Sequence, residues 1–116
     1  SAKSKGVAAK KHVEHGPVMT LDEFLVNLAD NSGDHFLKVT VGVEINKEKG
    51  VSEEAMKEKV ALIRDAIVTS LSSETREDVA TPKGRDLLKL EMKKRINEQL
   101  GDDLIKGVYF TNFVTQ

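Results

Sequence analysis

Histidines are the residues of this chain whose type and spacing first suggest chemistry. His12 and His15 form an H-x-x-H pair that a helix could present to zinc, but Gly16 and Pro17 oppose a rigid helix at this point. A zinc site also needs further ligands, and the chain contains no cysteine that could supply them or act as a nucleophile. We therefore expect no metal site and no cofactor.

The other polar motifs are explained by local structure. His35 lies beside a turn, where a solvated histidine is the ordinary case. The segment 81–85, TPKGR, combines a helix start with two cations that could attract an anion, although a capped helix start explains the same residues. Asp102 and Asp103 supply too few oxygens for calcium. With no G-x-S-x-G motif and no glycine-rich phosphate loop, we expect that the protein is not an enzyme.

Length and composition predict one ordinary globular domain. The chain has 116 residues, of which 39% are hydrophobic and 32% charged, and its net charge is -1. This balance gives no general attraction to nucleic acid, so we expect no nucleic-acid partner. Residues 1–19 carry scattered lysines without apolar periodicity and are interpreted as a flexible linker or a cloning remnant. Residues 20–116 form the predicted domain.

Two stretches with alternating apolar side chains predict an antiparallel β-hairpin. Residues 20–30 alternate, except that Leu25 falls on the polar side. Residues 36–45, FLKVTVGVEI, alternate without a break and place Phe36 on the polar face. The turn residues of the segment 31–34 connect the two predicted strands.

Helical periodicity follows the hairpin. Ser52 is the expected N-cap of one long helix, whose apolar stripe consists of Met56, Val60, Ile63, Ile67 and Leu71. A short helix is expected over residues 74–79, and a third helix should begin at Thr81 and Pro82 and end near Gly101. Leu87 and Leu90 lie away from the apolar line of this last helix. They are predicted to seat the short helix or, as the alternative, to form a subunit contact.

The final segment, VYFTNFVTQ, is predicted to be the third strand, either in a central position or with both faces covered. The expected fold is α+β, with a small three-stranded sheet in the order β-β-α-α-α-β packed on helices. Strict alternation places Tyr109 and Phe113 with Leu25 and Phe36 on the side of the sheet that the helices do not cover. We interpret this set as a partner or self-association surface, the alternative being coverage by the N-terminal tail or a helix.

Four blocks of the sequence, taken together, resemble the FliL family of flagellar basal body-associated proteins. They are LDEFLVNLAD, FLKVTVGVEI, IRDAIVTSLSSETREDVATPKGRDLLKLEMKKRINEQL and VYFTNFVTQ. The combination of LSSETREDVATPKG with the terminal VYFTNFVTQ is the most specific part of the resemblance. Asn112, where the family often has an acid, and Thr115, where an apolar residue is common, depart from the family pattern.

The resemblance implies a fold similar to stomatin and prohibitin domains and a non-enzymatic role in the flagellar motor. It also implies a periplasmic domain carried by a single-pass inner-membrane protein, with an apolar anchor of about 20 residues before Ser1. The expected partners are the stator proteins MotA and MotB and other basal-body components, together with further copies of the chain in a ring. The alternatives are a generic self-associating periplasmic scaffold and a small enzyme whose site has no known motif.

Overall fold

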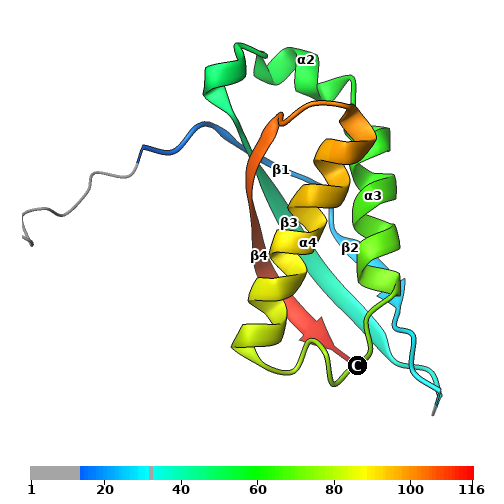
Figure 1. The fold of residues 1–116 in the computed structure, drawn as a ribbon. Helices are drawn as coiled ribbons and strands as arrows, with labels where there is room; N and C mark the ends of the chain where they lie inside the picture. The colour runs from blue at the N-terminus through cyan, green and yellow to red at the C-terminus, as the bar shows by residue number, and fades with distance from the viewer. Residues whose placement is uncertain (1–13, 32) are drawn as a thin grey trace, which may run out of the picture.

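The computed structural model of the chain describes residues 14–31 and 33–116 (Figure 1). Its elements are strands β1 (Val18–Thr20), β2 (Phe24–Asn27) and β3 (Phe36–Ile45), the 3₁₀ turn η1 (Lys47–Lys49), helices α2 (Glu53–Lys57), α3 (Val60–Ser72) and α4 (Pro82–Leu100), and strand β4 (Ile105–Thr115). The predicted α+β class is confirmed.

Strand β3 is the centre of an antiparallel sheet. It pairs with β4 on one edge and with β1 and β2, one after the other, on its other edge. The predicted hairpin is confirmed, with Phe24 opposite Val39 in the register of β2 and β3. The predicted count of three strands omitted β1, so the expected boundary between residues 19 and 20 falls inside a strand. The expectation of a central position for the last strand is wrong, because β4 lies at the edge.

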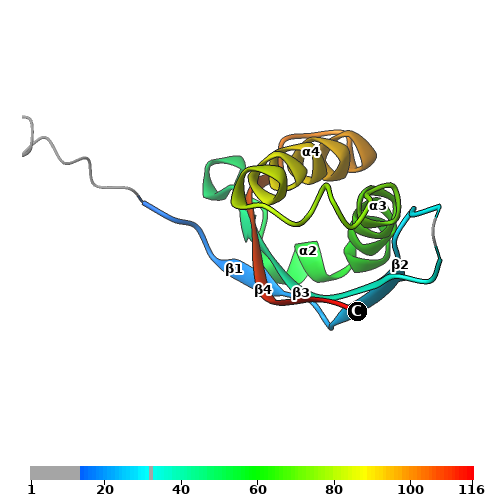
Figure 2. The ribbon, with the colours of Figure 1, turned by 90° about the horizontal axis from the view of Figure 1, so that it is seen from below.

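All described helices lie on one face of this sheet, as the view along the strands shows (Figure 2). The side chains of β3 that point to the helices are at most 1% exposed and comprise Leu37, Val39, Val41, Val43 and Ile45. Apolar side chains from the helices complete the core, and the largest are Met56, Ile63, Ile67, Leu71, Leu88, Met92 and Ile96. Removal of this apolar surface from water is the main stabilising contribution to such a fold.

Two helix predictions are corrected by the structure. The expected long helix is divided, because Glu58 N–H bonds Ala55 C=O and Lys59 N–H bonds Met56 C=O in a tight turn before α3. The apolar side chains on both sides of this turn keep the spacing of a single helix, so the periodicity of the sequence does not reveal the break. The prediction of a short helix over residues 74–79 is also wrong, because residues 74 and 75 are irregular and residues 76–79 form turns.

The boundaries of α4 agree with the prediction. Thr81 is the N-cap, and its side-chain oxygen accepts a hydrogen bond of 3.0 Å from the N–H of Gly84. The helix ends at Gly101, whose φ of 78° lies in the left-handed region that glycine adopts without steric cost. The capped helix start therefore accounts for the segment 81–85, and Arg85 donates to Val79 C=O at 2.9 Å.

A β-bulge at Asn112 changes the faces of the last strand. The register with β3 passes from Thr40–Thr111 to Lys38–Val114, so two residues of β4 oppose one of β3. Asn112 has a φ of 52°, a left-handed conformation that asparagine tolerates better than most residues. The extra residue turns Phe113 toward the helices and Val114 away from them, so the prediction that placed Phe113 on the helix-free face is wrong.

Candidate interaction surfaces

The helix-free face of the sheet carries an apolar patch formed by Leu25, Phe36 and Val114, here called the distal patch. These side chains are 63%, 37% and 46% exposed, respectively. Leu25 and Val114 are both register partners of Lys38, so they flank it on the same face, and Phe36 lies two residues before Lys38 on β3. The structure brings together the predicted Leu25 and Phe36 and adds Val114 through the bulge.

A second apolar feature of this face is a hollow above Gly42, here called the Gly42 hollow. Its volume is about 330 Å³, and its lining includes Val18, Tyr109 and the side chain of His15. Gly42 pairs with Thr20 on one side and with Tyr109 on the other, so the absence of its side chain leaves the floor open. The predicted Tyr109 therefore belongs to this hollow and not to the distal patch.

Beside the hollow, Glu44 joins the segment before β1 to the sheet. Glu44 is only 2% exposed and accepts hydrogen bonds from the Tyr109 hydroxyl at 2.5 Å and from Gly16 N–H at 2.9 Å. His15 Nδ1 lies 3.3 Å from the same carboxylate. A side chain at Gly16 would lie 2.1 Å from Ile45 O, so only glycine allows this close approach.

The protonation of this cluster follows from its contacts. Burial raises the pKa of Glu44, but the hydrogen bonds from Tyr109, Gly16 and His15 outweigh that effect and hold the pKa below its ordinary value. The same hydrogen bond raises the pKa of Tyr109, because the phenol donates to a carboxylate. An ionised Glu44 thus stabilises the attachment of residues 15 and 16.

Leu87 and Leu90 lie on the outer surface of α4. They are 58% and 62% exposed, so the prediction that they seat a short helix is wrong. Val79 is 1% exposed and is the residue of the 73–81 connection that enters the core. The alternative prediction, a contact with another subunit, is not tested by the structure.

Arg85 and Lys89 cover the aromatic side chains on the helix side of β4. The guanidinium of Arg85 lies 5.6 Å from the ring centre of Phe113, and the Lys89 ammonium lies 5.7 Å from that of Phe110. The two rings are 5.4 Å apart, in a tilted arrangement. Phe113 is therefore held inside the monomer by cation–π and aromatic contacts, which leaves less of it for a partner.

His35 belongs to a polar cluster that joins two loops. Its Nδ1 lies 2.8 Å from Asp30 and its Nε2 lies 3.2 Å from Arg76, whose backbone N–H also donates to Asp30 at 3.0 Å. The bond from the Arg76 backbone and the contact with His35 lower the pKa of Asp30 despite an opposing desolvation effect. Both ring nitrogens have partners, so the arrangement joins loops and leaves neither nitrogen free to activate a nucleophile.

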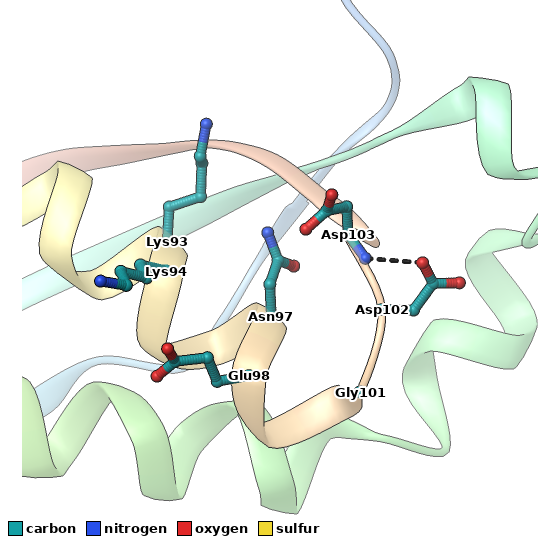
Figure 3. Close-up of a pocket in the computed structure, with 7 residues that line it drawn as sticks. All are labelled: Lys93, Lys94, Asn97, Glu98, Gly101, Asp102 and Asp103. Carbon is teal, nitrogen blue, oxygen red and sulfur yellow. Dashed lines mark hydrogen bonds between the residues drawn. The ribbon is translucent and has the colours of Figure 1, made fainter.

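A polar groove lies where α4 ends and the chain turns toward β4 (Figure 3). Asp102 contacts Lys49 at 2.9 Å and accepts a hydrogen bond from the N–H of Asp103, and both contacts lower the pKa of Asp102. The two predicted turn acids are thus used locally. Asn97 lies deeper and binds the backbone of Ile105 through both its amide atoms, at 3.0 and 2.9 Å.

The described residues contain no group of three or more potential metal ligands. His12, half of the H-x-x-H pair, lies outside them, while His15 contacts Glu44. Among the described helices, none is both long and apolar enough to cross a membrane.

The sequence analysis did not predict that Val18, Val114 and Glu44 contribute to these surfaces. The asparagine inside the last strand was the one sequence signal of the bulge that exposes Val114.

Comparisons with known proteins agree with the sequence pattern. The family model described as flagellar basal body-associated protein FliL matches residues 18–116. A flagellar protein FliL of Aquifex aeolicus is 41% identical over 104 residues, which cover 89% of this chain and 63% of that protein. Another flagellar protein FliL, from Bacillus subtilis, is 26% identical over 116 residues, which cover 98% of this chain and 79% of that protein. The chain belongs to the FliL family of flagellar basal body-associated proteins.

Proposed function

We propose that this domain is a non-enzymatic interaction module of the flagellar motor that supports the stator units. Family membership supports the flagellar role, and the distal patch of Leu25, Phe36 and Val114 is the observation that carries the interaction role. Apolar side chains clustered on an uncovered sheet face are typical of protein–protein contacts.

We further propose that the domain lies in the periplasm and is attached to the inner membrane by a single anchor that precedes residue 1. Residues 1–19 would connect the anchor to the domain, and Glu44 would then fix where this connection meets the sheet, because it binds Gly16. The stator proteins MotA and MotB are the proposed partners. Kinship with stomatin and prohibitin domains is part of the same proposal and rests on the resemblance in sequence.

Self-association into a ring is the second part of the proposal. Leu87 and Leu90 are exposed on α4, and α4 lies on the other face of the sheet from the distal patch, so they offer a separate contact. A molecule with two unlike contact surfaces can form head-to-tail rings. Phe113 has a smaller proposed role than the other predicted residues, because it packs against Phe110.

The decisive experiment replaces Leu25 by glutamate in the full-length protein in cells. Leu25 lies directly opposite Lys38 in the register, so the new carboxylate has a cross-strand partner and the fold is preserved. We expect weaker co-purification with the stator protein MotB and slower swimming in viscous medium. Thermal denaturation of the isolated domain checks that it stays folded.

Leu62→Glu is the matched control, because Leu62 is 44% exposed on α3, on the helix side of the domain. It should leave co-purification and swimming unchanged. Equal losses in both variants would contradict a specific role for the distal patch. Normal motility under load after deletion of the gene would refute the support of stator units altogether.

A further inference from the structure

Strand β4 has an edge to which no other strand of the described chain pairs. The hydrogen bonds on the far side of β3 define the alternation: Ile45 N–H donates to Pro17 C=O, and Leu21 N–H donates to Val41 C=O. In this half of β3, the backbone groups of odd-numbered residues therefore point toward β1, and those of even-numbered residues point toward β4.

The register carries this alternation across to β4, where Thr40 pairs with Thr111, Gly42 with Tyr109 and Glu44 with Gly107. The residues of β4 between these partners direct their N–H and C=O groups to the outer edge, because successive residues of a strand direct these groups to opposite edges. Val108 and Phe110 thus present their backbone groups to the free edge. Such groups are a template for another extended chain.

The backbone of the first residue of β4 is already hydrogen-bonded to a side-chain amide. Asn97 donates from Nδ2 to Ile105 C=O at 3.0 Å and accepts at Oδ1 from Ile105 N–H at 2.9 Å. A peptide unit of an added strand would offer the same pair of donor and acceptor. Asn97 therefore satisfies the first residue of β4, and the open part of the edge lies beyond it.

A groove of about 310 Å³ runs beside the open edge, between α4 and β4. Its lining contains Lys89, Lys93 and Lys106 with a single carboxylate, Asp86. Leu90, which is 62% exposed, supplies an apolar contact in the same groove. The groove thus combines an excess of positive charge with an apolar surface.

We propose that the β4 edge and this groove bind an extended segment of a partner protein in which acidic and apolar side chains alternate. Its backbone pairs with Val108 and Phe110, and its acidic side chains face α4, where their carboxylates contact Lys89 and Lys93 and their methylene groups cover Leu90. Its apolar side chains lie on the opposite face of the sheet, beside Tyr109. Backbone pairing supplies affinity, and the lysines select the charge of the segment. This inference does not depend on the flagellar assignment.

A second copy of the chain fits the edge less well. The other edge of its sheet is divided into β1, of three residues, and β2, of four residues. Short and interrupted edge strands are poor partners for a continuous ladder. Pairing of two β4 edges would bring the lysines beside both edges together, so an acidic segment from another protein is the favoured occupant.

The experiment titrates the chain with an acetylated octapeptide of alternating valine and glutamate, observed by amide NMR and hydrogen exchange. We expect protection of the amides of Val108 and Phe110 and shifts at Lys89 and Lys93. Two further peptides are tested: one carries lysine in place of glutamate, and one is N-methylated at alternate residues. The methylated residues are the glutamates, whose N–H groups would face β4. Neither peptide should bind, because the groove repels the first and the second lacks the donors that would pair with β4.

The variant carrying Lys89→Glu and Lys93→Glu should bind the acidic peptide about tenfold more weakly, since two favourable contacts become repulsive. The variant carrying Lys47→Glu and Lys57→Glu has the same change in net charge outside the groove and should bind normally. Equal binding of the lysine or N-methylated peptide would overturn the proposal. So would protection confined to β1 and β2, or concentration-dependent protection of Val108 without peptide, which would assign the edge to a second copy.

Discussion

Replacing Tyr109 with phenylalanine removes one hydroxyl group and leaves the aromatic ring that lines the Gly42 hollow. The hydroxyl donates to Glu44, a carboxylate that is only 2% exposed. After the change, Glu44 keeps the Gly16 N–H and His15 but loses one of its three hydrogen-bond partners. The variant therefore isolates a single contact between β3 and β4.

The expected loss of stability follows from the type of bond. A hydrogen bond to a charged group contributes about 1.5–3 kcal/mol net. Tyr109 is 38% exposed, so water competes for the hydroxyl and we expect a loss near the lower end, about 1.5 kcal/mol. For a chain of 116 residues, such a loss lowers Tm by about 6 °C, because the entropy of unfolding is about 2.1 cal/mol/K per residue.

The pH dependence gives a second, independent readout. The pKa of Glu44 is lower in the folded protein than its ordinary value of 4.5, so its ionisation stabilises the fold above that pH. This contribution is lost as the pH falls through the folded pKa. The difference in unfolding free energy between wild type and Tyr109→Phe should thus be full at pH 7 and should shrink in acid.

Urea unfolding of the two proteins at pH 7 and at several acidic pH values measures this difference. Tyr109 is the only tyrosine and the chain has no tryptophan, so alkaline absorbance reports its ionisation alone. Glu44→Gln should lower the pKa of Tyr109 toward 10.0, since the carboxylate that raises it is gone. A loss below about 0.3 kcal/mol at pH 7, or an equal loss at every pH, would refute the reasoning, because either excludes a bond to ionised Glu44.

Two further predictions test α4 and the bulge by urea unfolding. Leu88→Ala should cost about 2–5 kcal/mol because Leu88 is 2% exposed, whereas Leu87→Ala, on the 58% exposed neighbour, should cost less than about 0.5 kcal/mol; equal costs would contradict the orientation of the helix. Asn112→Gly should leave stability nearly unchanged, whereas Asn112→Val should cost about 1–2 kcal/mol because a β-branched residue resists the φ of 52°. A valine variant as stable as the glycine variant would mean that the bulge is absent.

Local signals in the sequence were sufficient to predict two elements. The alternation of residues 36–45 predicted β3, and Thr81, Pro82 and Gly101 predicted both ends of α4, because side-chain facing and capping depend on neighbouring residues alone. The two-sided apolar pattern of the last segment predicted a strand. This pattern did not predict that the strand lies at the edge of the sheet, because strand order depends on contacts between segments that are distant in the sequence.

Which residues share a surface depends on contacts between segments that are distant in the sequence. One extra residue at Asn112 reverses every later side chain of β4, so Phe113 joins the core side and Val114 joins Leu25. Glu44 lay on a face predicted to meet water, yet Gly16 and Tyr109 bury it from opposite ends of the chain. Periodicity describes one segment at a time, whereas a surface is made by segments that meet only after folding.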